Sequence, residues 1–105
     1  MKTIICGAGD VGYSIADKLS KENFEVTVVD EPSLKLNKIS ENLDVKVVTG
    51  LPSLPSVLMD AGAKDCEILI AVTKSDEANM TGFDNVAYVN NSEESTIHND
   101  ILDSA

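Results

Sequence analysis

The chain has 105 residues, of which 43% are hydrophobic and 25% charged, and this composition predicts a single small globular domain. Eight lysines stand against 18 acidic residues and arginine is absent, so the net charge is −10. This balance argues against nucleic-acid binding, which needs clustered positive charge. No apolar run reaches the roughly 20 residues of a membrane helix. The first residues lack the apolar stretch of a signal peptide, and we expect a cytoplasmic protein.

Short apolar runs alternate with helical patterns along the first 72 residues. The runs are rich in β-branched side chains, as in strands, and the segments between them carry apolar residues at helical spacing. The expected strands cover residues 3–6, 25–30, 45–48 and 68–72, and the expected helices cover residues 11–21, a segment opened by Pro32 and Ser33, and a short segment from Pro55 to Gly62.

This order of elements predicts an α/β fold. Strands that are apolar on both sides and alternate with amphipathic helices are typical of a parallel sheet with helices on both faces. Right-handed crossovers then favour a doubly wound, Rossmann-like sheet in which the strands are ordered 3-2-1-4.

The pattern is less regular after residue 72. Ser75 is a candidate cap for a further helix, residues 86–89 for a fifth strand, and Ser92 for the start of a last helix. We therefore divide the chain into a Rossmann nucleotide-binding core over residues 1–80 and an atypical tail over residues 81–105. The tail forms either one short strand and one helix or a partly disordered segment.

The segment CGAGDVG, from Cys6 to Gly12, contains the G-x-G-x-x-G pattern of dinucleotide-binding turns. It follows a predicted strand and opens a predicted helix, which is the context that gives the pattern meaning. Gly7 permits the tight turn, Gly9 leaves room for a pyrophosphate, and Gly12 allows close packing of helix and strand. The free N–H groups of the helix that begins near Val11 would face the phosphates.

Asp30 completes the fingerprint, 18 residues after Gly12 and at the end of the second predicted strand. A carboxylate there can accept hydrogen bonds from ribose hydroxyls and repels a 2′-phosphate, which favours NAD over NADP. The alternative is that Asp30 and Glu31 are ordinary loop acids. Asp10, inside the turn, either weakens the attraction for phosphate or caps the helix.

Gly50 and Thr73 follow the third and fourth strands, at the sheet edge where a Rossmann ligand lies. We expect Gly50 to let the chain pass close to an adenine and Thr73 to line the ligand site. The two cysteines, Cys6 and Cys66, are predicted at opposite ends of neighbouring strands, which argues against a disulfide. With one histidine and no cysteine cluster, we assign no metal site.

Five motifs together resemble one known family. They are GAGDVG, VVD, VTG, PSVLMDAG and AVTKSDEANM, and they resemble the N-terminal RCK or KTN nucleotide-binding domain of the Trk-type potassium-uptake regulators, the TrkA family. The resemblance covers about residues 1–80. It departs at Leu51 and Pro52, where the family commonly has a polar residue after the glycine, and it stops after Met80.

The resemblance implies a non-catalytic regulatory module that binds NAD or NADH, with ATP or ADP as alternatives. It implies assembly on a membrane potassium transporter or channel subunit, a homodimer or higher homo-oligomer, and a cytoplasmic location peripheral to the inner membrane through that partner. The nucleotide contacts that it implies come from Gly7, Ala8, Gly9, Asp10, Val11, Gly12, Asp30, Gly50 and Thr73.

Two other functions stay open. One is a cofactor-binding fragment of an NAD-dependent oxidoreductase, which would need a group that handles hydride transfer, and the region after the fourth strand offers only His98. The other is a Rossmann domain that binds nothing, because its negative charge repels phosphate. The family resemblance favours the regulatory module over both.

Overall fold

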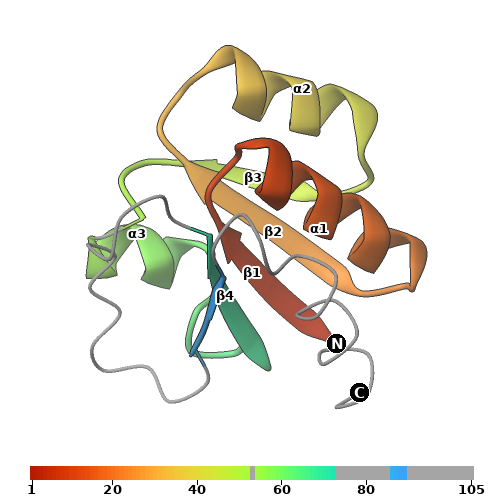
Figure 1. Cartoon of the computed structure of the whole chain (residues 1–105). Helices are drawn as coiled ribbons and strands as arrows, with labels where there is room; N and C mark the ends of the chain where they lie inside the picture. Colours follow the sequence, from red (N-terminus) through yellow and green to blue (C-terminus); the bar gives the residue numbers. More distant parts are fainter. Residues whose placement is uncertain (53, 73–85, 90–105) are drawn as a thin grey trace.

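The computed structural model describes residues 1–52, 54–72 and 86–89 of the chain (Figure 1). In this part, the strands form one parallel sheet in the order β3-β2-β1-β4-β5, and a helix follows each of the first three strands in the chain. The elements in chain order are β1 (Lys2–Cys6), α1 (Asp10–Lys21), β2 (Glu25–Asp30), α2 (Leu34–Asn42), β3 (Lys46–Thr49), α3 (Pro55–Asp60), β4 (Ile68–Val72) and β5 (Val86–Val89).

The central strands β1 and β4 are covered on both faces, and this explains their continuous apolar sequences. Ile4 lies opposite Leu69 and Ile5 opposite Ile70 in the parallel register, and all four side chains are buried. A strand with helices on both sides has no solvent face on which polar residues would alternate. The predicted Rossmann-like α/β sheet and its 3-2-1-4 strand order are therefore confirmed.

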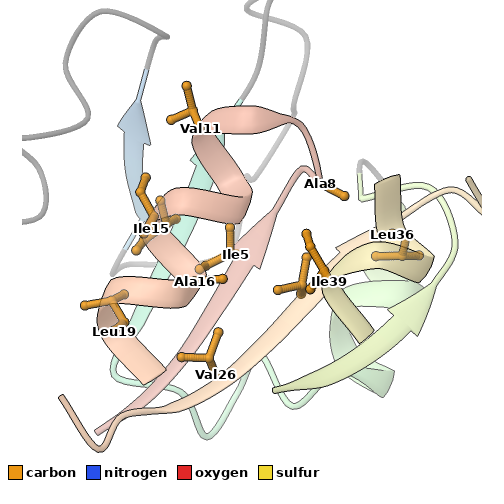
Figure 2. Packing of buried hydrophobic residues seen from close by; sticks show 11 residues of the cluster. Ile5, Ala8, Val11, Ile15, Ala16, Leu19, Val26, Leu36 and Ile39 are labelled. Carbon is orange, nitrogen blue, oxygen red and sulfur yellow. The ribbon is translucent and has the colours of Figure 1, made fainter. Parts of the chain in front are cut away.

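Helices α1 and α2 pack on one face of the sheet, and α3 packs on the other (Figure 1). Figure 2 shows Ile15 and Leu19 of α1 beside Ile5 and Val26 of the sheet, with Ile39 of α2 completing the cluster. The buried residues on the opposite face are Ile4, Cys6, Val29, Leu58, Ala63, Leu69 and Ala71.

The two longer helices begin in different ways. Helix α1 starts at Asp10, one residue earlier than predicted, with Gly9 as its N-cap and no side chain bonded to the cap position. The structure therefore does not place the Asp10 carboxylate as a cap. Helix α2 has the predicted serine cap, because Ser33 Oγ accepts a hydrogen bond of 3.1 Å from the Leu36 N–H.

The fifth strand is confirmed as β5, which pairs in parallel with β4. Strand β3 lies one residue later than predicted, because its last residue, Thr49, pairs with Asp30 at the end of β2. The helices predicted to begin at Ser75 and Ser92 lie outside the described residues. The division into a core and a tail stays a prediction. None of the helices in the described ranges is long and apolar enough to cross a membrane.

Candidate functional site

The glycine-rich turn joins β1 to α1, and two of its three glycines are required by the fold itself. Gly7 has a φ of +121°, and a Cβ on it would overlap with the carbonyl oxygen of Val72 in β4. A Cβ on Gly12 would overlap with the carbonyl oxygen of Gly7. The predicted tight turn and the predicted close approach of the helix are therefore both present.

Gly9 differs from these two glycines. A Cβ built on it would meet no atom of the described residues within 4 Å, and its φ of −71° is accessible to any residue. The fold therefore does not explain this glycine. Gly9 is also the N-cap of α1 and has no side chain to cap that helix, so among the described residues the turn presents open space beside the first backbone N–H groups of α1.

Asp30 lies beside this turn at the end of β2. Its Oδ2 accepts a hydrogen bond of 2.8 Å from the Ala8 N–H, and its Oδ1 accepts one of 2.7 Å from the Glu31 N–H. The structure thus brings together the two halves of the predicted fingerprint, which are 22 residues apart in the chain. The carboxylate also holds the turn in place, a role that sequence reasoning did not assign to it.

Gly50 reaches the same edge of the sheet from β3. Its N–H donates a hydrogen bond of 2.9 Å to the carbonyl oxygen of Asp30, and its φ is +155°. A Cβ on Gly50 would lie 2.8 Å from Val57 Cγ2 at the start of α3. The glycine therefore lets the chain leave β3 closely packed against α3, next to the predicted ribose position.

Two other predicted contact residues, Ala8 and Val11, face the core. Ala8 is 2% exposed and Val11 is 9% exposed, so only their main-chain atoms are suited to meet a ligand. The Asp10 side chain is exposed and lines the neighbouring pocket. Thr73 lies outside the described residues, and its predicted role stays a prediction.

Cys6 lies directly before the turn at the end of β1. Its side chain is 2% exposed, and burial raises its pKa to about 12, with smaller contributions from Cys66 and Asp30. A thiol with this pKa is neutral near pH 7 and is a poor nucleophile. Neither cysteine forms a disulfide, and the Cys66 thiol donates a hydrogen bond of 3.2 Å to the carbonyl oxygen of Ala63. Cys6 therefore packs in the core beneath the turn.

A pocket of about 430 Å³ opens between the turn and helix α2. Its lining residues are Ala8, Gly9, Asp10, Tyr13, Lys35 and Lys38. Sequence reasoning missed the last three of these. The signal that was available is the pair of lysines three residues apart, soon after the fingerprint aspartate, in a chain without arginine.

A larger cavity of about 580 Å³ lies at the other end of the sheet. It is bordered by residues such as Lys2 and Glu25, where β1 and β2 begin, and by Asp65 before β4. None of the predicted site residues lines it. Volume alone therefore does not identify the functional end of the sheet, and the glycine turn with Asp30 is the better candidate because its geometry has a specific chemical use.

Comparison with known proteins identifies the family. The family model of the TrkA-N domain matches residues 3–100, which is most of the chain. This chain belongs to the TrkA-N family. The matched residues include the glycine turn and Asp30.

Curated relatives in the TrkA-N family agree with this assignment. The Trk system potassium uptake protein TrkA of Haemophilus influenzae is 50% identical over 80 residues, which are 76% of this chain and 18% of that protein. The TrkA of Vibrio alginolyticus is 46% identical over the same shares, and the TrkA homolog of Archaeoglobus fulgidus is 36% identical. The matched region thus spans under one fifth of the length of these relatives.

Two solved structures are similar to this TrkA-N domain. The Kef CTD of Shewanella denitrificans in its AMP-bound form has a TM-score of 0.56 and 25% identity, over 72% of this chain and 43% of that one. The L-tryptophan dehydrogenase of Nostoc punctiforme has a TM-score of 0.61, covering 99% of this chain and 31% of its own, but its 18% identity supports only the shared fold.

Proposed function

We propose that this domain binds an adenine nucleotide at the turn between β1 and α1. The observation that carries the proposal is the open space at Gly9, next to an uncapped helix N-terminus and the carboxylate of Asp30. Backbone N–H groups at such a terminus bind phosphate, and a carboxylate at the end of the second strand binds ribose hydroxyls. The similar Kef CTD structure contains AMP, which supports an adenine nucleotide.

NAD or NADH is the proposed ligand, with ATP or ADP as alternatives. The contacts in this proposal are the main chain of the turn from Gly7 to Gly12, the Asp30 side chain at the ribose, and Gly50 and Thr73 beside the adenine. The turn residues and Asp30 lie at one edge of the sheet, and Gly50 is hydrogen-bonded to Asp30 there. No metal ion is needed for these contacts.

The output that we propose is regulation of potassium uptake without catalysis. The curated relatives are named as potassium uptake proteins, which supports this role. In this scheme, ligand binding changes which conformation of this protein is most populated. A membrane potassium transporter or channel subunit then responds to that conformation. The protein would act as a homodimer or larger oligomer on the cytoplasmic side of the membrane, held there by its partner.

Calorimetric titration with NAD, NADH, ATP and AMP tests the binding proposal. We expect saturable binding that Asp30→Asn weakens about tenfold, because the amide keeps an acceptor oxygen but loses the charge that strengthens hydrogen bonds to ribose hydroxyls. Glu31→Gln is the matched control, since it removes a neighbouring exposed charge. Absence of heat with every nucleotide, or an equal effect of both variants, would contradict the proposed site.

A further inference from the structure

The pocket between the turn and α2 brings two positive charges beside the proposed nucleotide site. Two of the eight lysines in the chain, Lys35 and Lys38, line it together with Ala8, Gly9 and Asp10 of the turn. We call these two residues the lysine pair. Within the described residues, neither member of the pair forms an ion pair or a side-chain hydrogen bond. Both ammonium groups are therefore available to a ligand.

The position of the lysine pair follows from the periodicity of α2. Leu36 and Ile39 are buried against the sheet, whereas Lys35 and Lys38 are exposed. Residues three apart in a helix project from neighbouring positions on the same side, so the two ammonium groups can act on one anion. Ser33 caps the helix only two residues before Lys35, which fixes the first turn that carries the pair.

The lysine pair lies on the ribose side of the proposed site. Ala8, which lines the pocket, donates its N–H to Asp30, the proposed ribose ligand. Helix α2 follows β2 directly, so the chain runs from Asp30 to Lys35 within five residues. A group that projects from a ribose at Asp30 towards α2 therefore enters the pocket that the lysines line.

The Asp30 carboxylate should also repel a ribose phosphate less than its position in the fingerprint predicts. Both carboxylate oxygens accept backbone hydrogen bonds, from Ala8 and from Glu31, which partly neutralise the charge that an approaching anion meets. The two lysine charges add to this effect. The expected discrimination against a ribose phosphate is therefore offset by residues that the fingerprint does not include.

We propose that the pocket between the turn and α2 binds a phosphate group carried on the adenosine ribose of the ligand, with Lys35 and Lys38 as the cations that hold this phosphate. The proposal rests on the proposed nucleotide site and adds a second anion position to it. A ribose phosphate carries between one and two negative charges near pH 7 and accepts charge-assisted hydrogen bonds from lysine. The domain then accepts a dinucleotide with this phosphate as well as one without it.

Titration of the chain with NADH and NADPH, followed by the fluorescence of the reduced nicotinamide, tests the proposal. We expect the two affinities of the unchanged chain to lie within about tenfold of each other. In the double variant Lys35→Met and Lys38→Met, NADPH binding weakens about tenfold more than NADH binding, because only NADPH carries the ribose phosphate. Methionine keeps a long side chain and a similar helix propensity, so α2 is retained.

The double variant Lys46→Met and Lys64→Met is the control. It changes the net charge equally, and both of its lysines are exposed and absent from the pocket lining. The control should leave the ratio of the two affinities unchanged. If the unchanged chain binds NADH but not NADPH, or if the Lys35 and Lys38 variant loses affinity for both equally, the proposal of a phosphate pocket is wrong and the nucleotide site stands. Binding of neither ligand would overturn the nucleotide site as well.

Discussion

The Ala8 N–H donates a hydrogen bond of 2.8 Å to Oδ2 of Asp30. This bond connects the turn after β1 to the end of β2, and Glu31 supplies a second N–H to the other carboxylate oxygen. The main-chain oxygen of Asp30 accepts a third bond, from Gly50 after β3. One residue thus holds the ends of three strands at the edge where the proposed ligand lies, so its substitution should affect both stability and binding.

Replacement of Asp30 with alanine should destabilise the ligand-free domain. The N–H groups of Ala8 and Glu31 would lose their acceptor, and we expect the free energy of unfolding to fall by about 1–3 kcal/mol. Urea denaturation measures this change. Asp30→Asn keeps one acceptor oxygen and should cost less. If Asp30→Ala unfolds at the same urea concentration as the unchanged chain, the carboxylate does not hold the turn.

Gly12→Ala should destabilise the domain, although alanine is normally the better residue within a helix. At an ordinary helix position this change stabilises by about 0.5–1 kcal/mol. Here the added Cβ would overlap with the carbonyl oxygen of Gly7, so α1 must move away from the turn. We expect a loss of about 1–3 kcal/mol or more in the free energy of unfolding, measured by thermal or urea denaturation. A rise in stability would show that the helix does not approach the turn this closely.

The first four strands could be predicted from sequence because each is a short run rich in β-branched residues that alternates with a helical pattern. The continuous apolar runs predicted strands covered on both sides, and Ile5 and Ile70 in them are buried; the glycine turn predicted the start of α1 to within one residue. The limits of β3 were less certain, because this short edge strand is only half-buried and its apolar pattern does not mark its end. Its last residue is fixed by pairing with Asp30, which is a tertiary contact.

The site could be predicted only in part. The G-x-G-x-x-G pattern identifies the turn, but the sequence does not show which of its three glycines, Gly9, has free space around it among the described residues. The bond between Ala8 and Asp30 depends on how closely β1 and β2 approach at their ends. Lys35 and Lys38 belong to the exposed side of an amphipathic helix, and sequence periodicity assigns such residues to solvent.

Gly50 and Val57 should show coupled effects on stability. Gly50→Ala would place a methyl group 2.8 Å from Val57 Cγ2 and would also strain a backbone with a φ of +155°. We expect it to cost at least about 1 kcal/mol in the free energy of unfolding. Val57→Ala removes the clash, so the double variant should be more stable than the sum of the single effects by about 0.5–1 kcal/mol in a double-mutant cycle. If the two substitutions change the free energy of unfolding in a strictly additive way, the Cβ added at position 50 does not contact Val57.

The buried thiol of Cys6 predicts a pH dependence of stability. Burial raises its pKa from the usual 9.0 to about 12, so the unfolded chain ionises first as the pH rises. The stability contributed by the neutral thiol is therefore complete below about pH 9 and is lost between pH 9 and 12, at up to about 1.4 kcal/mol per pH unit. Cys6→Ala should lack this loss in urea denaturation at increasing pH. Parallel pH profiles of the two proteins would contradict the burial of the thiol.

The most direct test of the nucleotide site is NADH titration of the chain and of its Gly9→Ser variant. Serine is a good N-cap and the conformation of Gly9 suits it, so the variant should be more stable than the unchanged chain by about 0.5–1 kcal/mol. Its side chain would enter the space proposed for the phosphates, so the NADH affinity should fall at least about tenfold. Equal NADH affinity of the two proteins, with the variant fully folded, would show that the nucleotide does not bind at this turn.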